Sequence, residues 1–143
     1  MKKNIILSLS VLALAMATSS CSKNDDTPKD PMLGHWVIDK YSTTKPGETS
    51  AEKDYTNPDC APNKNYIDLK ASSTLEMGNV NSSCELTKAP GTWALTDDLL
   101  VLKGAAVGTM NLYVTSVTAS TMALKMLTVA DGSSYYTLKL VKQ

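Results

Sequence analysis

The sequence predicts an all-β protein built as an antiparallel up-and-down barrel of about eight strands. Between residues 33 and 143 no convincing amphipathic helix appears, whereas short alternating segments recur between turn residues. Clean alternation of apolar and polar residues is typical of antiparallel strands that bury one face. Every connection after residue 65 is short, so successive strands are expected to pair as a meander, which closes into a barrel without exposed edges.

About eight or nine strands are expected along the chain. Asp97-Asp98, Ala119-Ser120 and Asp131-Gly132 are predicted to form hairpin turns, and Gly78-Asn79 is predicted to end a strand. Asp97 and Asp98 are therefore interpreted as turn residues and not as a catalytic pair. The expected strands cover residues 33–41, 66–70, 74–77, 93–95, 99–102, 110–118, 121–129 and 135–141, with a weaker strand at 85–88.

The N-terminus resembles a bacterial lipoprotein signal peptide. A positive start, Met1–Asn4, precedes the uncharged apolar run Ile5–Ala17, and Thr18–Ser20 leads to Cys21. The apolar run is too short to span a hydrocarbon core of roughly 30 Å. The pattern implies that residues 1–20 are removed and that Cys21 carries a lipid. The protein is then expected on the outer membrane, exposed at the cell surface or on the periplasmic face.

Ordinary secretion is the alternative, with cleavage after Ala15-Met16-Ala17 and Cys21 left as a free thiol. In either case residues 21–32 are predicted to be a flexible tether, because they are polar and interrupted by prolines. The acidic run Ser22–Asp26 resembles a surface-export signal, and a merely soluble spacer is the other interpretation. The folded domain is expected to cover residues 33–143.

Charge excludes one class of partner. Removal of residues 1–20 from the 143-residue chain leaves 123 residues, which suits one domain, with 12 Lys against 14 acidic residues. The chain has no Arg, the residue favoured for bidentate phosphate contacts. We therefore expect no nucleic-acid binding.

The cysteines support the lipoprotein interpretation. Three cysteines in a secreted protein leave one odd thiol, and a lipidated Cys21 leaves Cys60 and Cys84 as a pair. A disulfide between them would close a 25-residue loop and stabilise the fold by roughly 3 kcal/mol in the chain-entropy model. A redox or metal site is the rival interpretation, but the cysteines lack C-x-x-C spacing and the chain has a single His.

Two Gly-x-Trp motifs open strands, Gly34-His35-Trp36 and Gly91-Thr92-Trp93. The glycine permits a close backbone approach at a strand start, and the tryptophan can close one end of a barrel with a large apolar ring. Each tryptophan is expected to be a core residue or, alternatively, to contact a ligand.

On these residues the chain resembles the bacterial lipocalin-like family of small lipoproteins. Beside Cys21, the matching segments are Leu33–Trp36, Gly91–Leu95 with its partner Leu99–Leu102, and Tyr136–Leu140. The resemblance covers roughly residues 33–143 and implies an eight-stranded barrel with an internal cavity. Members of this family mostly lack an assigned activity. By the same resemblance the long polar segment 42–64 would gate that cavity, and a segment without a role is the alternative.

No catalytic pattern is present. His35 is the only histidine, and the sequence lacks a G-x-S-x-G elbow, an H-E-x-x-H helix and a phosphate-binding glycine loop. Acidic residues of the 42–64 segment, Asp54 and Asp59, do not follow the spacing of an EF-hand. We therefore expect no enzyme activity, no metal and no cofactor.

Two functions remain. The first is a binding module that holds a small apolar or amphipathic ligand in the barrel. The second is an accessory lipoprotein with a solid barrel core that binds a protein or a glycan through its rim, where Tyr113 and Tyr135 are expected to face outward. The residues expected to line the barrel, and so to contact a ligand, are Trp36, Ile38, Met110, Leu112, Met122, Leu124, Met126, Tyr136 and Leu138.

Overall fold

The fold is described from a computed structural model, in which the described residues are 30–105, 107–128 and 132–143. The predicted signal peptide, Cys21, most of the predicted tether and Asp131 of the predicted 131–132 turn lie outside the described residues. No helix among the residues described is long and apolar enough to cross a membrane.

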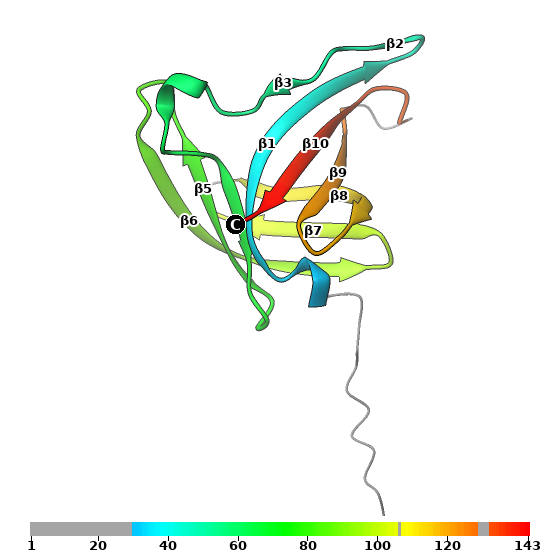
Figure 1. The fold of residues 1–143 in the computed structure, drawn as a ribbon. Helices are drawn as coiled ribbons and strands as arrows, with labels where there is room; N and C mark the ends of the chain where they lie inside the picture. Colours follow the sequence, from blue (N-terminus) through cyan, green and yellow to red (C-terminus); the bar gives the residue numbers. More distant parts are fainter. Residues whose placement is uncertain (1–29, 106, 129–131) are drawn as a thin grey trace, which may run out of the picture.

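The chain forms strands almost throughout, with two short 3-10 turns (Figure 1). The elements are η1 (Asp30–Met32), β1 (Gly34–Lys45), β2 (Glu48–Thr49), β3 (Lys53–Asp54), η2 (Pro58–Cys60), β4 (Tyr66–Leu69), β5 (Thr74–Val80), β6 (Leu86–Thr96), β7 (Leu99–Gly104), β8 (Gly108–Val117), β9 (Thr121–Leu127) and β10 (Tyr135–Lys142).

The strands form a closed antiparallel barrel, which confirms the predicted fold class. From β4 to β10 each strand pairs with the next one in the chain, and β1 pairs with both β4 and β10. Pairing of β1 with β10 closes the ring (Figure 1). The short strands β2 and β3 lie outside this ring and pair with the distal half of β1. The meander follows from the short connections, because tight turns join only neighbouring strands.

Several strand bounds differ from the prediction. β5 continues through Gly78-Asn79, where the ring of Tyr66 lies against Gly78 and leaves no room for a Cβ atom. The expected strands at 85–88 and 93–95 are one strand, β6, which passes through Pro90-Gly91. Pro90 lacks a backbone N–H, yet the pairing with β5 runs through it, and the pairing with β7 begins at the next residue, Gly91. The turns at 97–98 and 119–120 are confirmed, with Asp97 in the left-handed region at a φ of 53°.

The barrel interior is an apolar core contributed by all eight strands of the ring. Its side chains come from alternate positions, as the period of a β-strand requires. Met32 of η1 also belongs to this core and is only 1% exposed, so η1 packs with the barrel. The buried core residues are Met32, Trp36, Ile38, Ile67, Leu69, Leu75, Met77, Trp93, Leu100, Leu102, Leu112, Met122, Leu124, Leu138 and Leu140.

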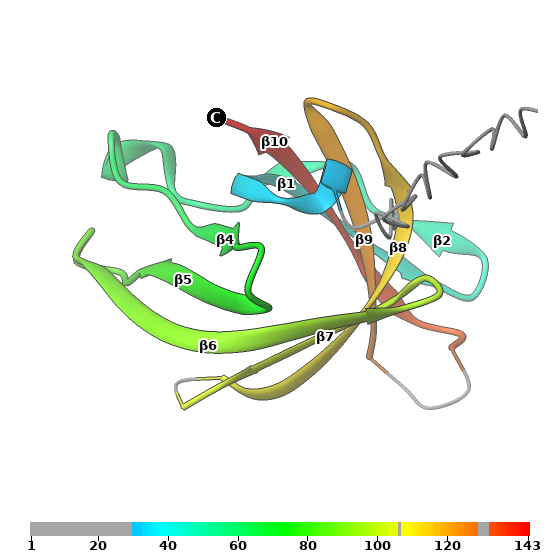
Figure 2. The same ribbon diagram turned by 90° about the horizontal axis from the view of Figure 1, so that it is seen from below.

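Both tryptophans of the Gly-x-Trp motifs lie at one end of the barrel, here called the closed end, which η1 and the turn 70–73 cover (Figure 2). The indole N–H of Trp36 donates to the carbonyl oxygen of Met32 at 2.6 Å. That of Trp93 donates to the carbonyl oxygen of Lys70 at 3.0 Å. Each buried indole therefore satisfies its donor on the segment that covers the closed end.

The 42–64 segment is attached to the barrel wall along its length. Its first residues extend β1 to Lys45, β2 and β3 return along that strand, and η2 ends at Cys60. The predicted Cys60–Cys84 disulfide is confirmed and ties the segment to the β5–β6 connection. The segment lies at the other end of the barrel, here called the loop end (Figure 1). These attachments make it a fixed part of the wall.

The closed end yields a stability prediction. We expect Trp36→Phe to lower the free energy of unfolding by about 2–3 kcal/mol, because it removes buried ring volume and leaves the Met32 carbonyl without its donor. Urea unfolding followed by far-UV circular dichroism measures the change. Tyr55→Leu, at a position 42% exposed on the loop end, is the control and should shift stability by less than about 0.5 kcal/mol. Equal midpoints for Trp36→Phe and wild type would contradict this role.

Candidate functional site

Six of the nine predicted ligand-contacting residues are buried inside the barrel, and one of these, Ile38, also lines a surface pocket described below. Trp36, Leu112 and Leu124 have an exposed fraction of 0%. A side chain beside an internal void wide enough for a water molecule would expose area to that void, so these three contact only protein atoms. Ile38, Met122 and Leu138 are 8% exposed or less. The closed half of the barrel is therefore a solid core, as expected when eight strands enclose space that side chains just fill.

The other three predicted residues, Met110, Met126 and Tyr136, are half-buried and lie toward the loop end. The two methionines pack against the core and also line a surface slit of about 380 Å³ between β8 and β9. The slit exists because the pairing of these two strands stops at Tyr113 and Lys125, although both strands continue beyond it. The slit residues are Thr109, Met110, Asn111, Tyr113, Met126 and Leu127.

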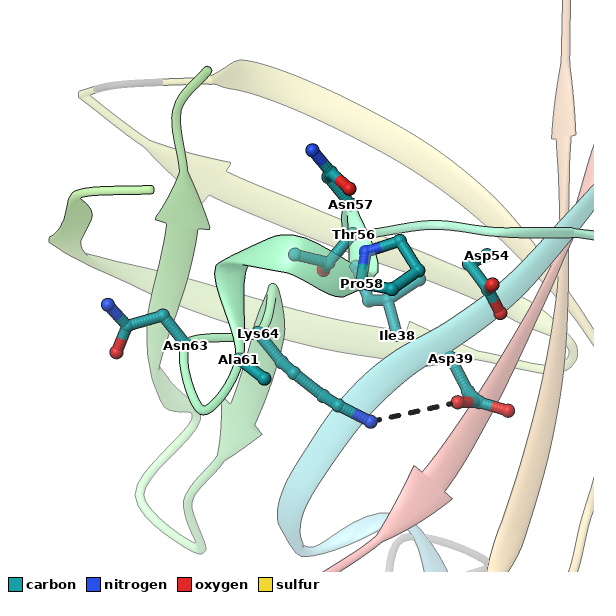
Figure 3. A pocket seen from close by; sticks show the side chains of 9 residues that line it. All are labelled: Ile38, Asp39, Asp54, Thr56, Asn57, Pro58, Ala61, Asn63 and Lys64. Atoms are coloured by element: carbon teal, nitrogen blue, oxygen red, sulfur yellow. Dashed lines mark ion pairs between the residues drawn. The ribbon is translucent and has the colours of Figure 1, made fainter. Parts of the chain in front are cut away.

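A second hollow, the loop pocket, has a volume of about 270 Å³ and lies between β1 and the segment 54–64 (Figure 3). The side chain of Lys64 runs across it toward the Asp39 carboxylate, and Asp54 lies beside Asp39 (Figure 3). The pocket is lined by Ile38, Asp39, Asp54, Thr56, Asn57, Pro58, Ala61, Asn63 and Lys64.

A β-bulge in β1 creates the loop pocket. The pairing with β10 shifts register between Ile38 and Lys40, so Asp39 is an extra residue in β1. Consecutive residues of a regular strand point to opposite faces, yet Ile38 and Asp39 line the same pocket. Bulges redirect side chains in this way and are frequent beside functional sites.

The far wall of the loop pocket is held by Asn65, a buried polar residue with 7% of its area exposed. Its backbone N–H and its side-chain Nδ2 both donate to Thr56 Oγ1, at 3.0 and 2.8 Å. Its side-chain Oδ1 accepts from the backbone N–H of Val80 at 2.9 Å. Its backbone carbonyl oxygen accepts from the backbone N–H of Ile38, also at 2.9 Å. Asn65 thus links the loop to β5 through its side chain and to β1 through its backbone carbonyl. No buried side-chain polar atom among the described residues lacks a partner.

Two ion pairs frame the loop pocket. Lys40 Nζ donates to Asp54 Oδ1 at 2.5 Å, across the β1–β3 pair, and this hydrogen bond raises the pKa of Lys40. Lys64 Nζ lies 4.0 Å from Asp39 Oδ1, which is a looser contact (Figure 3). All four side chains are at least 36% exposed, so these pairs contribute little to stability. They do balance the charge of the pocket.

His35 lies on the outer wall, with its ring centroid 4.4 Å from that of Tyr66. The Tyr66 hydroxyl donates to Glu76 Oε1 at 2.5 Å. Burial and this hydrogen bond raise the pKa of Tyr66 to about 12, and the same bond lowers the pKa of Glu76. In the described part of the chain no three His, Cys, Asp or Glu side chains form a group able to hold a metal ion.

Sequence reasoning missed the loop pocket. It treated residues 42–64 as one loop and assigned no role to Asp39, which ends the apolar stretch Trp36–Ile38. The sequence signal nearest to it is the polar group Asp54, Asn57 and Asp59, whose spacing excludes an EF-hand and indicates no other site. The bulge that adds Asp39 to this group depends on pairing with β10, nearly a hundred residues away.

Tyr113 and Tyr135, expected to face outward, are half-buried on the outer wall beside the slit. Lys125 pairs with Tyr113 across the sheet and places its Nζ 3.9 Å from the ring centroid of Tyr135. A cation over an aromatic face accounts for the position of Tyr135 without a partner protein.

Comparison with known proteins supports the lipocalin-like fold and gives no information on activity. No protein-family model matches the chain, and no curated protein does. Among solved structures, a lipocalin-like protein from Bacteroides uniformis ATCC 8492 matches with a TM-score of 0.56 and 10% identity, over 79% of this chain and 99% of that one. An uncharacterized protein from Bacteroides eggerthii DSM 20697 matches with a TM-score of 0.53 and 13% identity, over 78% and 98% of the two chains. The resemblance to lipocalin-like proteins is thus confirmed at the level of the fold.

The Tyr66–Glu76 pair predicts a pH dependence. In the unfolded chain Tyr66 ionises near its ordinary pKa of 10.0, and in the folded chain near 12. Between these values the unfolded state has lost a proton that the folded state keeps, so the free energy of unfolding falls as pH rises. We expect wild type to lose about 1–2 kcal/mol more than Tyr66→Phe between pH 9 and 11.5. Urea unfolding of both proteins across this range measures the difference, and parallel curves would contradict it.

Proposed function

We propose, from the lipocalin-like fold, that this protein is a lipid-anchored, non-catalytic binding protein of the bacterial cell envelope that binds a protein or a glycan through the loop end. The observation that carries the proposal is the sealed core: side chains with no exposed area fill the closed half of the barrel, including Trp36, Leu112 and Leu124. A filled barrel is a rigid scaffold, and function is commonly carried by the segments that such a scaffold positions.

The geometry of the loop end supports this assignment. The loop pocket collects charged and amide side chains on a segment held by the Cys60–Cys84 disulfide and by Asn65. Tyr55, the one large apolar residue that is exposed in the described chain, lies beside it in sequence. Its ring packs edge-on against Tyr41, with centroids 6.0 Å apart. Exposed aromatic side chains next to fixed polar groups are frequent in binding surfaces.

A small apolar or amphipathic ligand is the second candidate, and the slit favours it. Met110 and Met126 connect the slit to the core, and flexible methionine side chains adapt to varied ligand shapes. Such a ligand would contact the half-buried residues of the loop end and not the sealed residues of the closed half. The two candidates therefore differ in which strands meet the bound molecule.

Site-specific photo-crosslinking in intact cells tests both candidates. A benzoylphenylalanine replaces Tyr55 beside the loop pocket, Asn111 in the slit, or Asp97 at the closed end; all three are exposed. Rim binding predicts a high-mass adduct from position 55 that is absent from position 97. A ligand in the slit predicts a small mass increment at position 111. Adducts from position 97 alone, or from none of the three, would contradict both candidates.

Anchoring makes a separate prediction. If Cys21 carries the lipid, wild type incorporates a labelled fatty acid and sediments with the outer membrane, while Cys21→Ser remains an unprocessed precursor without label. The measurement is mass spectrometry of the N-terminal peptide together with membrane fractionation. Cys60→Ser with Cys84→Ser is the control, because it removes two thiols and should keep the label. An unlabelled wild type, processed after Ala17, would establish ordinary secretion instead.

A further inference from the structure

We propose that the loop pocket is a sugar-binding site, which takes a neutral, hydroxyl-rich unit of a glycan. The proposal rests on binding through the loop end and names the chemical class of the ligand. It follows from four properties of the pocket: its hydrogen-bonding groups, its charge balance, its apolar floor with its size, and its rigidity.

The hydrogen-bonding groups are mixed in type. Asp39 and Asp54 present carboxylate acceptors, and Lys64 presents an ammonium donor. Thr56 is a further donor, because its oxygen already accepts two N–H bonds from Asn65 and its own O–H proton must point elsewhere. Each sugar hydroxyl donates and accepts at once, so it needs both kinds of group close together.

The charges of the pocket cancel. Asp54 is paired with Lys40 and Asp39 faces Lys64, which leaves two positive and two negative charges around the site. A site for a phosphate or an acidic polymer needs excess positive charge. A metal site needs more carboxylate or imidazole ligands than the described residues bring together. The balance therefore favours a neutral ligand with strong, directional hydrogen-bonding groups.

The floor of the pocket is apolar. Ile38 comes from the barrel core, and Pro58 and Ala61 come from η2 and its end (Figure 3). Such a floor suits the C–H face of a sugar ring, whose hydroxyls would then reach the polar groups at the sides. The volume of about 270 Å³ lies just below the roughly 300–1,000 Å³ of pockets that enclose drug-sized molecules, which suits one or two sugar rings with the rest of the glycan in solvent.

The backbone around the pocket is held in place before any ligand binds. Asn65 fixes the 54–64 segment to β1 and β5, and the backbone N–H of Tyr55 donates to the carbonyl oxygen of Asp39 at 3.0 Å. The Asn63 side chain donates to the carbonyl oxygen of Cys84 at 3.0 Å, beside the disulfide. A preorganised site loses little conformational entropy on binding, which matters for weak ligands such as single sugar units.

The proposal is tested by measuring binding of the full mature lipoprotein, in detergent, to an array of neutral and acidic oligosaccharides. Titration calorimetry then gives the affinity for the oligosaccharide that binds most strongly. We expect binding to neutral glycans. We expect Asp39→Asn and Lys64→Met each to weaken it by about tenfold, because each removes a charge-assisted hydrogen bond. Asp97→Asn is the matched control: it makes the same chemical change at the closed end, in a left-handed conformation that Asn tolerates, and should bind as wild type.

Three outcomes would overturn the proposal. The first two are no binding on the array and a preference for acidic glycans. The third is neutral-glycan binding that Asp39→Asn and Lys64→Met leave unchanged, with both variants unfolding at the wild-type midpoint. The crosslinking result separates this proposal from the broader one. If no glycan binds on the array but position 55 gives a crosslinked adduct, the sugar proposal is wrong and rim binding stands, with a protein as the partner. If no glycan binds and position 55 gives no adduct, both the sugar proposal and rim binding are wrong.

Discussion

The filling of the barrel around Trp36 is the constraint on which the rest of the structure depends. Its ring is fully buried, and its indole N–H holds the Met32 carbonyl at the closed end. Because the closed half is occupied by side chains, the protein gains a stable core at the cost of interior space for a ligand. A bound molecule is thereby directed to the loop end and to the slit.

The loop end is built by irregularities in an otherwise regular sheet. The bulge at Asp39 places a carboxylate beside Ile38. The early end of the β8–β9 pairing opens the slit near Met126. The first is a shift of ladder register, which releases side chains from the strict alternation of a strand, and the second is an end of ladder pairing between two strands that both continue. The regular part of the barrel provides stability, and these two departures provide the surfaces on which a function can act.

The long polar segment has a different role from the gate that the family resemblance implied. Strands β2 and β3 pair it to β1, and the Cys60–Cys84 disulfide and Asn65 hold its end. Opening this segment would break several hydrogen bonds at once, including those of a buried amide, which costs more than a surface loop gains in entropy. It is better described as a wall that shapes the loop pocket.

The sequence by itself determined the fold class, the meander order of the ring strands and the Cys60–Cys84 pair, and it left each tryptophan open between a core residue and a ligand contact. These depend on local alternation, turn residues and cysteine parity, all of which are visible within short stretches of chain. Only the tertiary structure decided that the closed half is solid and that Asp39 joins Asp54 in one pocket. The physical reason is that packing volume and strand register are set by contacts between distant strands, such as β1 with β10, and no local pattern encodes them.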